Sequence, residues 1–307
     1  MVPNENPDYE SYMKKMNQEA KTSTKKLLAG QNERYTIQTG ILQIIMTIVV
    51  VLFAIPVFFI ANYSFKTVRE LYLSNPLALP QRFSIDNYLA AYQKLDLGTT
   101  FFNTLFYTVA AVILLAVLCG ASAWAIARCK QRFFKFSYIY FLLGLFIPYQ
   151  ALFLPIYIVG YKTGMVNTRI GVILMYIATG MSFGVFLMTS FMTTVPVELE
   201  EAAKIDGCSI YRTYFSIVLP LLKPAIATLV ILQAFQIWND YLMASLFISR
   251  QDLRTLTVAI QTLFSREATI YNVAVAAIVV SVVPIAILFL SLQKYFVTGM
   301  TVGAVKG

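Results

Sequence analysis

Long apolar segments without charge limit what this chain can fold into. Five runs of 26 to 31 residues contain no Asp, Glu, Lys or Arg, and a sixth run contains only Asp240. These runs are residues 35–65, 99–127, 136–161, 170–195, 224–249 and 268–293. A helix needs about 20 mainly apolar residues to cross a bilayer, whereas strands of a membrane barrel have about ten residues with alternating polarity. The runs therefore predict an all-α polytopic membrane protein with six transmembrane helices.

The distribution of basic residues predicts the orientation. We place the spans near residues 37–61, 101–127, 136–160, 170–192, 223–248 and 269–293. They form a membrane domain of residues 35–293, between a polar N-terminal tail, residues 1–34, and a C-terminal tail, residues 294–307. Because cytoplasmic loops are rich in Lys and Arg, four basic residues within 128–135 place both tails in the cytoplasm. On the opposite side, four basic residues fall between the first two spans.

Composition excludes several classes of protein. Charged residues make up 13% of the chain, against about 25% in soluble domains, which excludes an ordinary water-soluble enzyme. There is no His, and the three Cys (Cys119, Cys129 and Cys208) are far apart in sequence. This pattern opposes a disulfide framework, a zinc site or a histidine-based catalytic relay. The net charge of +9 is explained by cytoplasmic basic loops, so no nucleic acid partner is expected.

The loop between the fourth and fifth spans, residues 194–220, has a marked local pattern. Thr194 is placed to cap a short helix, and Glu200 is spaced for an ion pair with the lysine four residues later. Gly207 can end this helix in the left-handed conformation, and Ser209 can cap a second short helix. The residues alone leave two interpretations open, a hairpin that lies on lipid headgroups or an element that docks in a protein groove.

The same loop resembles the EAA motif of ABC importer permeases. The matching residues, at the spacing of that motif, are Glu201-Ala202-Ala203, Gly207, Ile217 and Leu219-Pro220. Other segments are similar to one subgroup of that family, the carbohydrate-uptake permeases of the maltose-transporter type. These segments are Asn62 to Lys66, Phe83 to Tyr88, Ala123 to Arg128, Ile147-Pro148 with Pro155 to Tyr157, and Trp238 to Tyr241. The resemblance covers about residues 40–295, and Asp240 stands where the subgroup commonly has Glu.

The resemblance implies a permease subunit that passes a sugar or oligosaccharide inward by alternating access. It implies four kinds of partner besides the lipid bilayer: a second homologous permease subunit, two ABC ATPase subunits, an extracytoplasmic solute-binding protein and the sugar itself. The expected location is the cytoplasmic membrane of a prokaryote. Loop 194–220 would be the coupling helix that docks on an ATPase subunit. Its expected contact residues are Glu201, Ala202, Ala203, Asp206, Gly207, Leu219 and Pro220.

ATP hydrolysis is not assigned to this chain. The sequence contains no Gly-x-x-x-x-Gly-Lys-Ser/Thr motif, which is the loop that cradles ATP phosphates in such ATPases. We therefore assign ATP and Mg²⁺ to the partner ATPase, and expect no cofactor, metal site or catalytic residue on this chain.

Asp240 is the only charged side chain within the six apolar runs. A carboxylate inside the bilayer costs about 2.5–3.5 kcal/mol on insertion scales, so it should face a cavity or a partner group. Trp238, Asn239 and Asp240 could line the substrate path by stacking on a sugar and bonding its hydroxyls. The alternative is that they serve helix packing and a hydrogen bond between helices.

Three other functions remain open from the sequence. A permease for a non-sugar solute would carry the same EAA loop. An ion-coupled secondary transporter would be expected to have several acids or histidines inside the membrane, and this chain has one Asp there and no His. A membrane enzyme would need catalytic groups at a shared depth, and the predicted spans offer no such pair.

Overall fold

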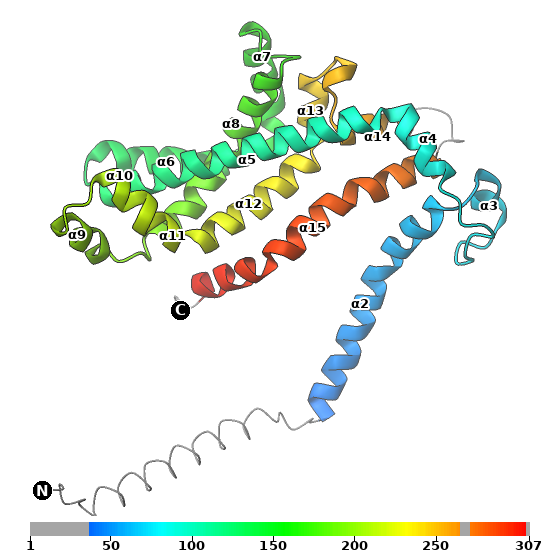
Figure 1. Ribbon diagram of the computed structural model, residues 1–307, viewed down its shortest axis with the longest axis horizontal. Helices are drawn as coiled ribbons and strands as arrows, with labels where there is room; N and C mark the ends of the chain where they lie inside the picture. Colours follow the sequence, from blue (N-terminus) through cyan, green and yellow to red (C-terminus); the bar gives the residue numbers. More distant parts are fainter. Residues whose placement is uncertain (1–36, 265–270, 305–307) are drawn as a thin grey trace, which may run out of the picture. The chain divides into compact units, whose positions relative to one another are not determined.

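The structure, a computed structural model, describes residues 37–264 and 271–304, and every regular element in these ranges is helical (Figure 1). The predicted all-α class is therefore confirmed for the described part of the chain. The predicted N-terminal tail, residues 1–34, lies outside it. The chain divides by its internal contacts into two units, residues 1–58 and 59–307.

Helix α2 (Ile37–Ser64) supplies the described part of the first unit and the first residues of the second. Large apolar side chains are exposed at nearly every position from Ile41 to Phe53, and so on all sides of the helix. A helix that is apolar all round is typical of a membrane span. Its length and composition are sufficient to cross a bilayer.

The core of the second unit is a group of long helices. They are α5 (Leu97–Arg128), α8 (Arg169–Met192), α12 (Lys223–Trp238) and α15 (Tyr271–Ala304). Helix α5 packs along α8, and α12 contacts α5, α8 and α15. The last helix continues past residue 293, so part of the predicted C-terminal tail, residues 294–304, is helical.

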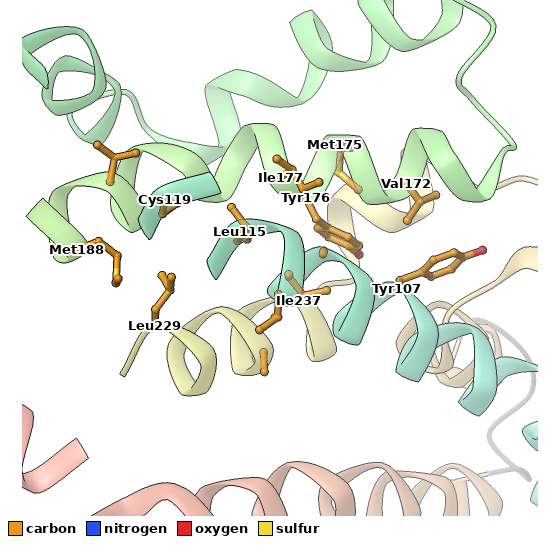
Figure 2. Packing of buried hydrophobic residues seen from close by; sticks show 14 of the residues in the cluster. Tyr107, Leu115, Cys119, Val172, Met175, Tyr176, Ile177, Met188, Leu229 and Ile237 are labelled. Carbon is orange, nitrogen blue, oxygen red and sulfur yellow. The ribbon is translucent and has the colours of Figure 1, made fainter. Parts of the chain in front are cut away.

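Buried side chains from three of these helices form one apolar cluster. Figure 2 shows members of this cluster, among them Leu115 and Cys119 of α5, Met188 of α8, and Leu229 and Ile237 of α12. All five side chains are less than 5% exposed. The cluster therefore holds α5, α8 and α12 together in the middle of the unit.

Two glycines let α5 and α8 approach each other closely. A Cβ atom at Gly184 of α8 would overlap the Sγ atom of Cys119, and one at Gly180 would lie 2.8 Å from Leu115 Cδ1. Glycines spaced four apart form a surface on which another helix backbone can come close. The Gly180 and Gly184 pair is such a surface.

Two of the predicted spans are interrupted. Residues 136–160 are divided between α6 (Arg132–Leu145) and a segment of η1 and α7, Tyr149–Lys162, at an angle of 105°. Pro148 lies in this break, where it has no N–H for a helical hydrogen bond and disfavours helix in the residue before it. The predicted span 223–248 is also interrupted, because α12 ends at Trp238.

Within the described residues, four helices are long and apolar enough to cross a membrane, or up to six if each bent pair forms one span. The second bent pair joins Ile210–Leu221 to Lys223–Trp238 at 72°. Shorter helices complete the connections. They are α3 (Val68–Leu73), α4 (Asp86–Leu95), η1 (Tyr149–Leu152), α7 (Phe153–Lys162), α9 (Glu198–Ile205), α10 (Ile210–Thr213), the π-helical turn η2 (Tyr214–Val218), α11 (Leu219–Leu221), α13 (Leu242–Phe247), η3 (Gln251–Leu253) and α14 (Leu256–Phe264).

The close packing of α5 on α8 can be tested at one atom. Gly184→Ala places a methyl group against Cys119 Sγ, and overpacking of this kind costs about 1–3 kcal/mol of unfolding free energy. We expect a lower melting temperature for the purified chain in detergent, and partial recovery in Gly184→Ala/Cys119→Ala, which removes the sulfur. Gly40→Ala, at a position with open space around it, is the control. An unchanged melting temperature for Gly184→Ala contradicts the packing.

Candidate functional site

Helix α9 contains the EAA residues and ends at a glycine, as the sequence predicts. Gly207 has φ +77°, and its N–H donates to the carbonyl of Lys204 at 3.1 Å while the N–H of Cys208 donates to Ala203 at 2.9 Å. These two bonds form the Schellman motif, which satisfies the last carbonyls of a helix. Ser209 caps the following helix by accepting from the N–H of Arg212, as predicted.

The predicted cap at Thr194 is wrong. Helix α9 begins at Glu198, and the residue before it, Val197, makes no side-chain cap. The hydroxyl of Thr194 instead donates to the carbonyl of Phe191 at 2.7 Å. The preceding helix α8 ends at Met192, and Thr194 satisfies one of the last carbonyls of that helix.

Glu200 attaches α9 to the end of α5. Its Oε2 accepts from Trp124 Nε1 at 2.9 Å and its Oε1 from Arg128 Nε at 2.8 Å. Arg128 also donates to the carbonyl of Val195 at 2.9 Å. The predicted ion pair with Lys204 is therefore absent among the described residues, because the carboxylate of Glu200 is directed to α5. Trp124 and Arg128 belong to a segment that carries the family resemblance, but the sequence alone did not assign them this role.

The second half of the loop is attached to the same end of α5. The ring of Tyr214, in the turn η2, lies 5.1 Å from the ring of Trp124. A Cβ atom at Gly120 would lie 2.8 Å from the Tyr214 hydroxyl, so the glycine leaves room for that ring. The loop is therefore held on α5 at two places, through Glu200 and through Tyr214.

Most of the predicted coupling residues remain at the surface. Ala203 is buried and Leu219 is half-buried, whereas the others are exposed, namely Glu201, Ala202, Asp206, Gly207 and Pro220. Apolar side chains beside them are also exposed, with Ile205 at 86% and Tyr211 at 75%. Glu201, Ala202, Asp206 and Gly207 therefore lie on α9 and its end, beside a surface that is partly acidic and partly apolar, whereas Leu219 and Pro220 lie in α11.

The three residues predicted for the substrate path do not converge. Trp238 is buried, and its Nε1 donates to the carbonyl of Ser281 in α15 at 2.9 Å. The side chain of Asn239 is exposed and donates to the carbonyl of Phe235. Trp238 thus packs within the fold, and of these two neighbours only Asn239 has a free surface.

Asp240 has a structural task at the break after α12. Its carboxylate accepts from the hydroxyl of Tyr176 at 3.0 Å and from the N–H groups of Met243 and Ala244 at 3.4 and 2.9 Å. The carboxylate thus satisfies two of the first free N–H groups of α13 from the position before its N-cap residue, Tyr241, as a capping side chain does. The carbonyl of the same residue accepts from the Thr257 hydroxyl at 2.7 Å. Asp240 therefore connects α8, α13 and the start of α14.

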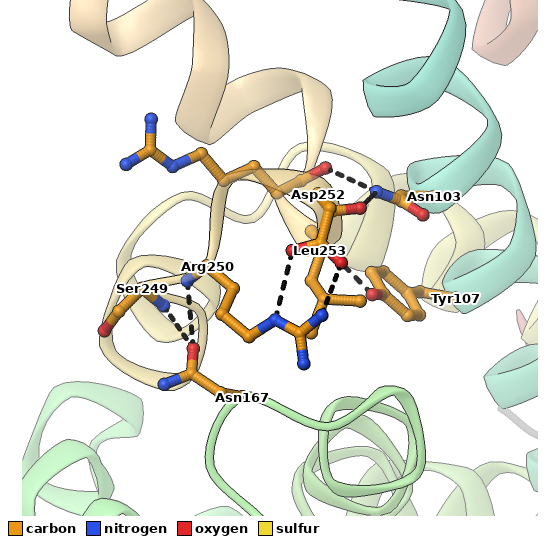
Figure 3. Close-up of polar contacts among 8 residues, drawn as sticks. Asn103, Tyr107, Asn167, Ser249, Arg250, Asp252 and Leu253 are labelled. Atoms are coloured by element: carbon orange, nitrogen blue, oxygen red, sulfur yellow. Dashed lines mark hydrogen bonds and ion pairs between the residues drawn. The ribbon is translucent and has the colours of Figure 1, made fainter.

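A chain segment between α13 and α14 is held by side chains from two other elements (Figure 3). Asn103 of α5 donates to the carbonyls of Asp252 and Arg254 at 2.8 and 3.2 Å. From the loop before α8, Asn167 Oδ1 accepts from the N–H groups of Ser249 and Arg250 at 2.6 and 3.1 Å. These bonds fix the backbone of residues 249–254, which the sequence did not indicate.

The side chains of Arg250 and Asp252 form an exposed ion pair at 2.7 Å on this segment. The hydrogen bonds from Arg250 lower the pKa of Asp252 below its ordinary value. Both charges are therefore presented on a backbone that other elements hold in place.

A polar network also connects the segment after α2 to α4 and α15. Asn87 donates to the carbonyls of Ser64 and Lys66 at 2.8 and 2.9 Å, and it accepts from the amide of Asn272. Asn62 donates to the carbonyls of Pro76 and Ala78. Asn62 and Asn87 lie in two of the segments that carry the subgroup resemblance, so this network accounts for both.

A large hollow of about 1030 Å³ lies along α5, η2, α12 and α15. Its lining includes Leu105, Val112, Ile226 and Ile285 and is mainly aliphatic and aromatic. Sugar hydroxyls need hydrogen-bonding partners, and a polar group buried without one costs free energy. The hollow therefore offers few polar groups to a sugar, although Trp238 of the predicted substrate path is among its lining residues.

Comparison with known proteins identifies relatives along most of the chain. Residues 113–302 match the family described as binding-protein-dependent transport system inner membrane component. The probable starch degradation products transport system permease protein AmyC of Thermoanaerobacterium thermosulfurigenes is 36% identical, over 88% of this chain and 98% of that protein. The melibiose/raffinose/stachyose import permease protein MelC of Bacillus subtilis is 35% identical, over 87% of this chain and 96% of that protein.

A solved structure has a similar fold. It belongs to a bacterial ABC transporter involved in the import of the acidic polysaccharide alginate, and it covers 86% of this chain and 100% of its own chain with a TM-score of 0.74. The sequence identity is 23%, so this likeness concerns the fold alone.

The attachment of α9 can be tested by removing its acceptor. Glu200→Ala leaves Trp124 Nε1 and Arg128 Nε without their carboxylate, and a hydrogen bond to a charged group contributes about 1.5–3 kcal/mol. We expect faster amide hydrogen exchange in α9, measured by mass spectrometry on the purified chain. Glu198→Ala, at an exposed glutamate of the same helix, is the matched control. Equal exchange in both variants contradicts the attachment.

The role of Asp240 can be tested by the thermal stability of variants at this position. Asp240→Ala removes the acceptor for the N–H groups of Met243 and Ala244, and loss of a capping side chain costs about 1 kcal/mol of unfolding free energy. We expect a lower melting temperature in Asp240→Ala, a smaller decrease in Asp240→Asn, which keeps an acceptor oxygen, and a smaller decrease in Tyr176→Phe. If Asp240→Ala melts like the unaltered chain but changes sugar selectivity, the residue contacts substrate rather than capping the helix.

Proposed function

We propose that this chain, which belongs to the family of binding-protein-dependent transport system inner membrane components, is the permease subunit of an ATP-driven ABC importer of sugars or oligosaccharides. The family resemblance predicted from the EAA loop is confirmed by the match over residues 113–302. The relatives are named as permeases for starch degradation products and for melibiose, raffinose and stachyose. A carbohydrate is accordingly the substrate class that we assign.

The membrane arrangement that we propose has six spans. They are α2, α5, the bent pair of α6 and α7, α8, α12 continued by α13, and α15. Bent or broken helices are tolerated inside a membrane where neighbouring helices satisfy the freed backbone groups, as Asp240 does for the start of α13. The density of basic residues at 128–135 supports cytoplasmic termini in the inner membrane of a prokaryote.

The loop from α9 to α11 is the coupling element in this proposal. The observation that carries the assignment is the double attachment to α5, with Glu200 bonded to Trp124 and Arg128, beneath a surface of exposed EAA residues. An ATPase subunit that moves against α9 would displace α5 with it, because a charged hydrogen bond and a packed aromatic pair connect them. Closure of the ATPase pair could then change which side of the membrane the substrate path faces.

Several partners follow from the proposed role. We assign a second homologous permease subunit, two ABC ATPase subunits that bind ATP and Mg²⁺, and an extracytoplasmic solute-binding protein. The sequence has no ATP-binding loop of its own, which supports a transport subunit that is not an enzyme. Among the residues predicted for the substrate path, the exposed side chain of Asn239 is the proposed contact, with Asp240 orienting the break beside it.

Gly207 offers a test that separates coupling from folding. Gly207→Leu forces a left-handed conformation that costs roughly 1–2 kcal/mol in a non-glycine residue, at the end of α9 where no atom lies within 4 Å of an added Cβ. A cost of about 1.4 kcal/mol lowers the population of the native end of α9 about tenfold. We expect sugar-stimulated ATPase activity and uptake to fall by about the same factor. The assay uses proteoliposomes of the complete complex with its binding protein and a panel of sugars.

Gly164→Leu is the matched control, since Gly164 also has a positive φ, +71°, and open space around it. It should leave coupling unchanged, because Gly164 lies outside the EAA loop. Unchanged uptake in Gly207→Leu overturns the coupling assignment. A complex that responds only to an amino acid or another non-sugar solute overturns the carbohydrate assignment.

A further inference from the structure

Four basic residues lie between the first two proposed spans, on the side that normally carries few of them. Lys66 is buried, and its Nζ donates to the carbonyls of Asn75 and Pro76 at 3.3 and 3.4 Å, above the ring of Tyr63. Lys94 lies in the last turn of α4, where a cation is favoured by the helix dipole. These contacts account for Lys66 and Lys94 but not for the other two basic residues, Arg69 and Arg82.

Both remaining arginines line one polar hollow of about 440 Å³. Its complete lining is Thr67, Arg69, Glu70, Leu73, Ser74, Gln81 and Arg82. Arg69 and Arg82 are exposed, and neither guanidinium has an ion pair or a side-chain hydrogen bond with any other residue in the described part of the chain. The hollow therefore has two cations whose donors are available.

The one acid of the hollow is already engaged. Glu70 Oε2 accepts from the N–H and hydroxyl of Thr67 at 2.8 and 2.9 Å, and its Oε1 accepts from the N–H of Gln81 at 2.7 Å. The backbone bonds from Thr67 and Gln81 lower the pKa of Glu70, so it remains ionised. With two arginines and one glutamate the lining has a net charge of +1, and its charged donors both belong to the arginines, beside the neutral side-chain amide of Gln81.

The same segment exposes large apolar side chains. Leu73, which lines the hollow, is 75% exposed, and Leu77, Leu79 and Phe83 are 65%, 64% and 70% exposed. Thr67 follows the end of α2 at Ser64 by three residues, so it lies within about 10 Å of the end of that span. Apolar side chains with arginines at this depth match the boundary between acyl chains and headgroups, where long basic side chains extend toward the phosphates.

We propose that Arg69 and Arg82 bind the phosphodiester group of an anionic phospholipid. The guanidinium group forms paired hydrogen bonds with phosphate oxygens, and the exposed leucines and Phe83 would contact the acyl chains of the same lipid layer. Free phosphate presents the same chemistry but makes no use of these apolar side chains. The proposal rests on the proposed membrane arrangement, and it assigns this outer segment an attachment to the bilayer surface.

The test uses the full-length chain in detergent, with phosphatidylglycerol or phosphatidylcholine added and bound lipid counted by native mass spectrometry. We expect Arg69→Gln/Arg82→Gln to weaken phosphatidylglycerol binding about thirtyfold, because each cation near an anionic surface contributes roughly a fivefold factor. Lys162→Gln, at an exposed lysine outside the hollow, is the control and should bind like the unaltered chain. Phosphatidylcholine should bind more weakly in every case.

Three results would overturn the proposal. The first is equal phosphatidylglycerol binding in the unaltered chain and the double variant. The second is displacement of the bound lipid by millimolar inorganic phosphate, which would identify a free anion as the ligand. The third is observed with the complete complex: if the double variant no longer retains the solute-binding protein but still binds phosphatidylglycerol like the unaltered chain, the arginines contact a protein partner. The Gly207 variants test transport separately, so either proposal can fail without the other.

Discussion

The close approach of α5 and α8 is the contact on which the rest of the structure depends. Gly180 and Gly184 of α8 have no side chains, and the side chains of Leu115 and Cys119 of α5 lie directly against them. Since α12 packs into the same cluster, α5 lies at the centre of the second unit. The segments that connect the long helices are then positioned by side chains on this one helix.

Helix α5 holds a connection at each of its ends. Near its start, Asn103 and Tyr107 bond to the backbone of the segment before α14. At its other end, Trp124 and Arg128 hold the EAA loop. A displacement of this helix would therefore move both connecting segments. A permease that links an ATPase on one side to substrate entry on the other needs such a connection.

The local parts of this arrangement could be predicted from sequence. Apolar runs indicate membrane helices, and the span predicted at 170–192 corresponds to α8, Arg169–Met192. The left-handed Gly207 and the cap at Ser209 depend on neighbouring residues only, and both are confirmed. The family was also predicted correctly, because the EAA motif is local and specific.

The parts that the sequence did not predict depend on distant residues. Glu200 was assigned to a lysine four residues away, whereas its partners Trp124 and Arg128 are 76 and 72 residues away in sequence. The run around Asp240 is apolar enough to predict a continuous helix, but the carboxylate stabilises a new helix start with help from Tyr176, 64 residues earlier. Spacing along one helix contains no information about such partners.

The long-range bonds made by three asparagines differ in their acceptors from the bond that holds the EAA loop. Asn62, Asn87 and Asn103 bond to backbone carbonyls, which do not titrate and carry no net charge. On the proposed outer side these bonds keep their strength when the acidity or salinity of the medium changes. The bond between Glu200 and Arg128 depends on ionised groups and lies on the proposed cytoplasmic side, where the cell controls both quantities. The three asparagine contacts on the side that meets a variable environment therefore use neutral acceptors, whereas the local turn at Glu70 uses an ionised one.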